Sequence, residues 1–297
     1  MNKKNNKIIN HVFIFTVSVL LTTFFIVFVR NNVAYIFAKD IVHNSLIKGI
    51  INVAVILIIC IPIILKLGFK ESIGLNTCKS FYKGFGMLSI LIFAGLCYSG
   101  IIYISYKDVL VQFQGIGMLF SLIFMMLTVG IMEEFGIRGI LLQIYIQKWG
   151  KNKKGIMWAA FLSSFIFGLQ HVFSSIVQFL RTSEISSETI WQTIFQVIIT
   201  TTIGFLFAIV VIYKKNIWIV AIIHGVYDFL LALHYVYLPP SMVYNVSLST
   251  AFSQLFGENN IFSRGNAEII FFSVACIIEV VWTIILCFKK ECNCSEP

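Results

Sequence analysis

Seven ionisable residues lie inside stretches of this sequence that are otherwise almost wholly apolar. They are Glu133, Glu134, Arg138, His171, His224, Asp228 and Glu279. An ionisable side chain in hydrocarbon costs about 2.5 to 3.5 kcal/mol on insertion scales, so a membrane helix that keeps one usually has a use for it. Carboxylates and imidazoles are also the groups that most often transfer protons in enzymes. These residues are therefore the first candidates for chemistry.

The first group combines two adjacent acids with an arginine. Glu134 and Arg138 are four residues apart, so on a helix they lie on one face and can pair. This leaves Glu133 as the unpaired acid. Because burial and a neighbouring carboxylate both disfavour the charged form, at least one of the two acids could take a proton from water and later deliver it to a leaving amine. The alternative is a salt-bridged pair that only fixes helix packing.

Two histidines lie on separate apolar segments. One histidine in a membrane helix is usually a packed, hydrogen-bonded residue, but His171 and His224 together with the acids predict a convergent cluster. Asp228 follows His224 by four residues and could orient its imidazole by accepting from the second ring nitrogen, anchor a water, or satisfy a polar neighbour. The cluster contains no Ser or Cys with a clear base partner, which favours a hydrolase that activates water. Glu279 stands apart, and a structural hydrogen bond explains it better than a role in substrate entry.

The composition predicts the environment of these residues. Hydrophobic residues make up 59% of the 297 residues and charged residues 12%, whereas soluble domains carry about 25% charged residues. A soluble globular protein is therefore excluded, and we predict an all-α polytopic membrane helix bundle in a lipid bilayer. Apolar stretches of about 20 residues predict eight transmembrane helices. The predicted spans are 8–29, 46–65, 84–106, 116–146, 156–178, 189–213, 217–237 and 267–288.

The basic residues predict the orientation of the bundle. Most Lys and Arg fall in alternate loops, as the positive-inside rule requires if both termini are cytoplasmic. The net charge of +9 is spread over these small clusters and forms no continuous basic face, which excludes nucleic-acid binding. The seven cysteines contain no C-x-x-C pair and indicate neither a disulfide framework nor a zinc ribbon.

Three motifs follow one another on three hydrophobic helices. They are Glu133-Glu134-x-x-x-Arg138, Phe167-x-x-x-His171 and His224-x-x-x-Asp228. In this order they resemble the motifs of the CPBP intramembrane proteases, a family named for CAAX prenyl endopeptidases, abortive-infection proteins and bacteriocin-processing enzymes. The motifs span 133–228, about a third of the chain. We therefore take 1–297 as a single transmembrane domain with a CPBP-like catalytic core at 116–237.

The resemblance implies an active-site cavity inside the membrane and hydrolysis of a peptide bond in a membrane-associated protein or peptide. It implies that Glu133 is the general base, that Glu134 and Arg138 structure their motif, and that His171 and His224 hold water or the oxyanion. Phe167 would support the site. At the position of Asp228, prenyl-processing members carry Asn, and many bacterial members carry Asp or Asn. An ionised Asp cannot donate to an oxyanion as an amide can, which disfavours prenyl-protein processing.

The role of a metal stays open at this point. His171, His224 and Glu133 could supply the three protein ligands of a catalytic zinc ion. The same groups could also work without a metal, with Glu133 deprotonating water while the imidazoles position it. The family is described both as metal-dependent and as glutamate-dependent. The absence of an H-E-x-x-H motif favours the metal-free form.

Two other functions could use the same residues. A proton-coupled transporter would relay protons through the intramembrane acids and histidines, but it predicts Pro or Gly breaks at matching points of two repeats, and we find none. A non-catalytic membrane scaffold or immunity protein of the same family would not need every polar motif position, and all are present.

The substrate is not readable from the sequence. Candidates are the leader of a bacteriocin or signalling peptide, a prenylated protein tail, or a membrane-anchored regulator. Richness in Ile, Lys and Asn is typical of an AT-rich bacterial genome. This indicates a bacterial plasma membrane and also disfavours a prenylated substrate.

Overall fold

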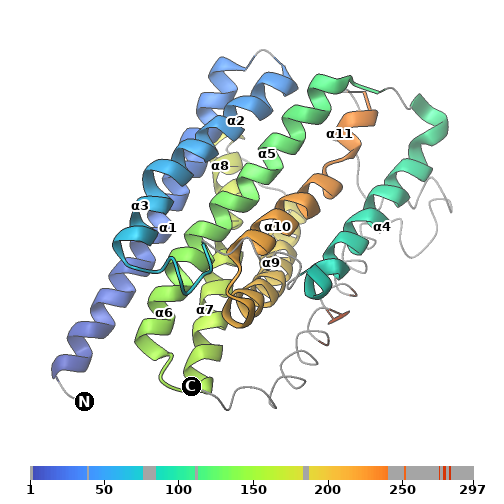
Figure 1. Cartoon of the computed structure of the whole chain (residues 1–297). Coiled ribbons are helices and arrows are strands. Elements are labelled where there is room, and N and C mark those ends of the chain that lie inside the picture. Colours follow the sequence, from blue (N-terminus) through green and yellow to red (C-terminus); the bar gives the residue numbers. More distant parts are fainter. Residues whose placement is uncertain are drawn as a thin grey trace.

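A computed structural model of the chain describes residues 3–38, 40–75, 85–110, 113–182 and 187–239, with five single positions further on. The described residues form helices and turns and no strand (Figure 1). The α-helices are α1 (Lys3–Phe37), α2 (Ile41–Val55), α3 (Ile61–Lys66), α4 (Phe85–Leu110), α5 (Ile116–Glu134), α6 (Leu142–Trp149), α7 (Lys153–Gln170), α8 (Val172–Thr182), α9 (Ser187–Lys214), α10 (Ile217–Leu231) and α11 (His234–Tyr237). The predicted all-α helix bundle is confirmed.

Six continuous helical segments in the described part of the chain are long and apolar enough to cross a membrane. They are Val12–Phe37, Ile41–Lys66, Leu88–Lys107, Ile116–Trp149, Lys153–Val177 and Ile190–Lys214. Large apolar side chains such as Phe25, Ile58, Phe93 and Trp191 are exposed on these helices, where a bilayer would cover them. The protein is therefore an integral, multi-pass membrane protein.

These segments correspond to the first six predicted spans. The seventh, predicted at 217–237, is divided, because α10 ends at Leu231 and the chain turns through Ala232 and Leu233 into the short helix α11. The eighth predicted span at 267–288 lies outside the described residues apart from four single helical positions, and Glu279 lies outside them as well.

The first span differs from its predicted bounds. It runs over Val12–Phe37, not 8–29, and Arg30 is inside the helix and not in an outside loop. Two features explain this. The apolar run resumes directly after Asn32, and the Arg30 Nη1 donates to Asn52 Oδ1 of α2 at 3.3 Å, which satisfies part of the guanidinium inside the bundle.

Helix α5 lies between α2 and α10 in the bundle (Figure 1). Two glycines let the backbones of α5 and α10 approach closely. A Cβ atom on Gly130 would lie 2.5 Å from the Ala221 carbonyl oxygen, and one on Gly225 would lie 2.7 Å from Leu127 Cα. Only glycine fits such contacts, so this crossing brings the acids at the end of α5 beside the histidine of α10.

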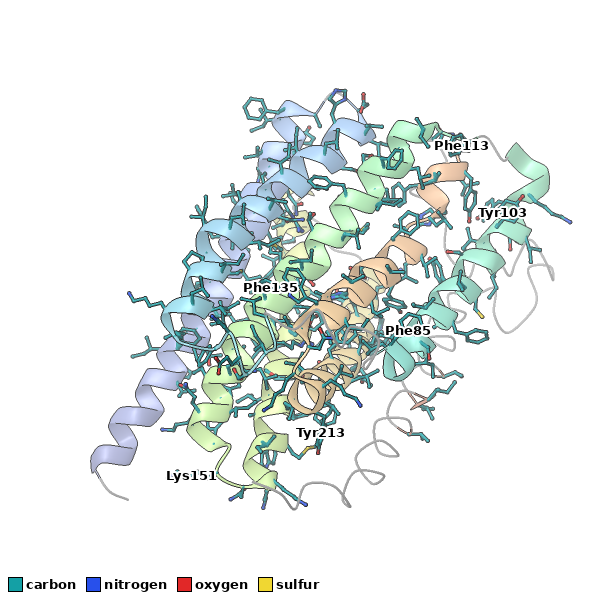
Figure 2. All side chains as sticks on the ribbon, in the orientation of Figure 1. Phe85, Tyr103, Phe113, Phe135, Lys151 and Tyr213 are labelled. Carbon is teal, nitrogen blue, oxygen red and sulfur yellow. The ribbon has the colours of Figure 1, made fainter. Side chains whose placement is uncertain are left out.

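Two π-helical segments interrupt the α-helical pattern. The first is η1 (Ile56–Cys60), between α2 and α3. The second is η3 (Phe135–Leu141), which follows Glu134 directly and contains Arg138. Single π-helical turns inside α-helices are rare and occur often at functional sites. In Figure 2, Phe135 lies about midway between Phe113 and Lys151, which mark opposite ends of the bundle.

Candidate active site

Glu134 is the centre of the polar cluster. Its Oε1 atom accepts from Arg138 Nη1 at 2.9 Å and from His224 Nδ1 at 2.9 Å. The side chains of Glu134 and Arg138 have no exposed surface, and that of His224 is almost fully buried. The pair predicted from the four-residue spacing is thus present, and it also holds a histidine 90 positions further along the chain.

Aromatic rings and a glycine enclose the guanidinium of Arg138. Its Cζ lies 4.4 Å from the centre of the Phe167 ring and 5.5 Å from that of Phe207. Cations over aromatic faces are attracted by the ring quadrupole, more strongly when water is excluded. Gly204 of α9 leaves the space for this group, because a Cβ there would lie 2.6 Å from Arg138 Nη2.

Phe167 also contacts both histidines of the cluster. Its ring centre lies 5.2 Å from that of His171 and 5.8 Å from that of His224, each in an edge-on arrangement. Since the same ring covers Arg138, Phe167 fixes three members of the cluster at once. The structure thus places Phe167 against Arg138, His171 and His224.

The orientation of His224 follows from its bond to Glu134. Because Nδ1 donates to a carboxylate, Nε2 points to the other acids, 3.8 Å from Glu133 Oε2 and 3.5 Å from Asp228 Oδ2. The acceptor that orients the ring is therefore Glu134, and Asp228, which the spacing suggested for this part, lies at the outer limit of hydrogen-bond length. Glu133 and Asp228 keep 24% and 26% of their side-chain surface exposed, so these two acids are reachable from outside the cluster.

His171 belongs to the same cluster and comes from the end of α7. Its Nδ1 lies 3.1 Å from the carbonyl oxygen of Phe167, one helical turn earlier, which makes Nδ1–H the donor. In the neutral ring, Nε2 then carries no proton. Its charge environment includes both Glu133 and His224. The motif residues of α5, η3, α7 and α10 therefore lie together, as the sequence predicts.

The geometry does not form a zinc site from these residues. Among the residues that the structure describes, no three His, Cys, Asp or Glu side chains come together as metal ligands would. One nitrogen of His224 is already bonded to Glu134. The predicted ligand set of His171, His224 and Glu133 thus does not fit a catalytic zinc in this arrangement.

Arg30 is a polar residue near the site that the sequence analysis did not single out. It donates to Asn52 Oδ1 at 3.3 Å, and Asn52 Nδ2 donates to Thr128 Oγ1 at 3.3 Å. Its charge interacts with that of Glu133. The signal that could have identified Arg30 is the apolar run from Val33 to Phe37, which extends the first span beyond it.

A cavity of about 500 Å³ opens at the end of the bundle where α1 turns into α2. Residues of α2, the first half of α5 and Tyr235 line it. None of the motif residues is among its lining residues.

One comparison with known proteins matches the segment that carries the motifs. The family model for type II CAAX prenyl endopeptidase Rce1-like proteins matches residues 115–230, which include all three motifs. The resemblance found from the motifs is confirmed over this segment. Searches of curated proteins and of solved structures gave no match.

Proposed function

We propose, starting from the match of residues 115–230 to the Rce1-like type II CAAX prenyl endopeptidases, that this protein is an intramembrane endopeptidase that hydrolyses peptide bonds with glutamate-activated water. The observation that carries the proposal is the bond between Glu134 and His224, which turns His224 Nε2 toward Glu133. An oriented imidazole beside a partly accessible carboxylate is suited to hold a water molecule, and the 3.8 Å between the two groups is a separation that a water can bridge.

In the proposed reaction, Glu133 takes a proton from water while the water oxygen attacks the carbonyl carbon of the substrate. Glu133 then gives this proton to the leaving nitrogen as the carbon–nitrogen bond breaks. No other co-reactant is required. His171 Nε2, which carries no proton, would accept from the attacking water.

His224 has a different part in this mechanism. The carboxylate of Glu134 at 2.9 Å stabilises a second proton on the imidazole, so Nε2–H can donate to the carbonyl oxygen as it becomes negative. Arg138 holds the carboxylate of Glu134 in place through its contact at 2.9 Å. The aromatic rings of Phe167 and Phe207 exclude water from this pair, which strengthens its electrostatic interactions.

The proposed substrate is a membrane-associated protein or peptide, for example the leader of a bacteriocin or signalling peptide, in maturation or immunity. The name of the matched family refers to prenylated proteins. For this chain we favour a non-prenylated substrate, because Asp228 offers a carboxylate at 3.5 Å from His224 Nε2 and not an amide donor. We propose a bacterial plasma membrane on the basis of the composition, and both termini in the cytoplasm on the basis of the loop charges.

The test uses purified protein in proteoliposomes and two quenched fluorogenic peptides. One carries a farnesylated cysteine near its carboxyl end, and the other has an apolar helical leader. The change Glu133→Gln removes the base but keeps the shape, and it should reduce cleavage by about 100-fold to 10,000-fold. Glu71→Gln, at an exposed acid in the turn after α3, is the matched control and should cleave as the wild type does.

Other outcomes point to other functions. Undiminished cleavage by Glu133→Gln would contradict the proposed mechanism. A wild-type protein that binds a peptide without cleaving it would be a scaffold. Proton flux across the proteoliposome membrane without cleavage would indicate a transporter.

A further inference from the structure

The cavity at the α1–α2 end of the bundle has two unlike walls. Helix α5 supplies an apolar wall of Met118, Leu122 and Met125, and the first turns of α2 supply the polar residues Asn44 and Ser45. In Figure 2 this is the end of the bundle marked by Phe113. A volume of about 500 Å³ is within the range of pockets that bind small ligands or short peptide segments.

The same helix faces continue from the cavity toward the catalytic cluster. Asn52 follows Lys48 by four residues on α2, and Thr128 follows Met125 by three residues on α5. Residues at these spacings share a helix face. Asn52 and Thr128 are buried, and Asn52 Nδ2 donates to Thr128 Oγ1. Arg30 of α1 donates to Asn52 Oδ1, the other polar atom of the same amide. We call these three residues the Arg30 chain.

The Arg30 chain lies between the cavity and Glu133. Thr128 precedes Glu133 by five residues and Met126, at the inner end of the cavity wall, precedes it by seven. At 1.5 Å per residue, the end of the cavity is therefore about 10 Å from the general base along α5. Arg30 and Glu133 form no ion pair, but they are near enough for their charges to attract each other.

Arg30 has donor capacity that the described residues do not use. Its Nε–H is buried and has no hydrogen-bond partner among the described residues. No carboxylate of the described chain lies within ion-pair distance of its guanidinium. Since an arginine inside a membrane helix is costly, this position needs a compensating role, and carbonyl oxygens of a bound peptide would satisfy such donors.

We propose that the cavity and the Arg30 chain bind the part of the peptide substrate next to the bond that Glu133 hydrolyses. The inference rests on the proposed endopeptidase function and adds where the substrate lies. An extended peptide rises about 3.3 Å per residue, so about three residues span the distance from the cavity to Glu133. An apolar side chain occupies the methionine and leucine wall, and the backbone carbonyls accept from Arg30. Because methionine side chains adapt their shape, this subsite accepts apolar side chains of several sizes.

The first experiment narrows the cavity. Met125→Trp should raise KM for the cleaved fluorogenic peptide at least about tenfold, a loss of about 1.4 kcal/mol of binding, with kcat within about twofold. Met125→Leu keeps the side-chain volume nearly unchanged, so its KM should equal that of the wild type. Phe120→Trp, on an exposed position of the same helix, is the control and should change neither constant. An unchanged KM for Met125→Trp, or a fall in kcat alone, would overturn the inference.

The second experiment does not depend on cleavage. In a chain whose seven cysteines are replaced by serine and which carries Glu133→Gln, Met125→Cys is labelled with a maleimide in proteoliposomes. Addition of the leader peptide should slow this labelling several-fold and should leave the labelling of Phe120→Cys unchanged. Equal rates with and without peptide at both positions would refute the subsite. If the peptide protects Met125→Cys but the Glu133→Gln variant still cleaves, the subsite is supported. Only the role of Glu133 as general base is then refuted.

Discussion

Glu134 and His224 form a hydrogen bond of 2.9 Å between Oε1 and Nδ1 in the interior of the bundle. The bond joins α5 to α10 and fixes which nitrogen of the imidazole faces the accessible acids. Arg138 donates to the same carboxylate oxygen through Nη1 at 2.9 Å. The three side chains therefore act as one unit, in which Glu134 serves both to hold the two helices together and to position His224.

The first prediction concerns the charge of this unit. Glu134→Gln keeps the side-chain shape but leaves Arg138 buried without a counter-charge. Removal of one partner of a buried ion pair costs about 3 to 5 kcal/mol, so the variant should unfold at a much lower temperature in detergent. The double change Glu134→Gln with Arg138→Met removes both charges and should recover part of the stability, while cleavage stays absent because His224 has lost its anionic acceptor. A Glu134→Gln variant as stable as the wild type would contradict this account.

The crossing of α5 and α10 gives a second prediction. Gly130→Ala puts a methyl group 2.5 Å from the Ala221 carbonyl oxygen, so the helices must move apart, at a cost of about 1 to 3 kcal/mol. The separation also lengthens the contact between Glu134 and His224, and kcat should fall more than the loss of folded protein explains. Gly117→Ala on the same helix meets no atom within 4 Å. It should be neutral or stabilising by up to about 1 kcal/mol in thermal unfolding, with unchanged kcat.

Much of the fold was predictable because hydrocarbon imposes a simple rule on sequence. Helices that cross a bilayer need long apolar runs, so six spans were recognised with approximate bounds. The bounds of the first span were wrong because a polar residue there is satisfied inside the bundle. The predicted first span stopped before Arg30, because an arginine is costly in a membrane. Its partner Asn52 is on another helix, and no local sequence pattern reveals such a bond.

The sequence predicted which residues lie together in the candidate site, but it did not predict which of them contact one another. The four-residue spacing correctly paired Glu134 with Arg138, because both lie on one helical segment. The same spacing suggested Asp228 as the partner that orients His224, but the acceptor is Glu134, 90 positions away. Spacing along a helix shows only neighbours on that helix, and contacts between helices depend on where the backbones cross, here at Gly130 and Gly225.

The third prediction addresses Asp228. Asp228→Asn keeps the size and adds an N–H donor beside His224 Nε2, so it should preserve or raise kcat/KM. Asp228→Leu removes the polar group 3.5 Å from His224 Nε2 and should lower kcat/KM, because nothing on α10 then holds the imidazole edge or a water at this position. Both values come from the fluorogenic assay in proteoliposomes. If the Asn variant falls as far as the Leu variant, the carboxylate charge itself is required.

The fourth prediction concerns metal removal. The described His and acidic side chains do not converge as zinc ligands, and His224 Nδ1 is engaged by Glu134. Treatment with 1,10-phenanthroline followed by gel filtration should therefore leave the cleavage rate unchanged. The control is thermolysin under the same treatment, which must lose its activity. A loss that added zinc reverses would show that the acids and imidazoles rearrange around a metal.

The last prediction is that the stability of the start of α2, which lies outside the membrane spans, depends on pH. Asp40 caps this helix, since its Oδ1 accepts from the His43 backbone N–H at 2.8 Å and its Oδ2 lies 2.8 Å from His43 Nδ1. These hydrogen bonds favour the carboxylate and lower the pKa of Asp40 below its ordinary value of 3.8. The cap therefore contributes stability above the unfolded-state pKa and loses it as the pH falls through the lower folded-state pKa.

The measurement is amide hydrogen exchange at His43, together with an NMR titration of the Asp40 carboxyl carbon. The midpoint should lie below 3.8, and protection of the His43 amide should decrease over the same range. Asp40→Ser keeps a capping oxygen that does not titrate, so its protection should not change with pH in this range. A midpoint at or above 3.8 would mean that the carboxylate does not cap α2, and the polar wall of the cavity would then begin from a frayed helix end.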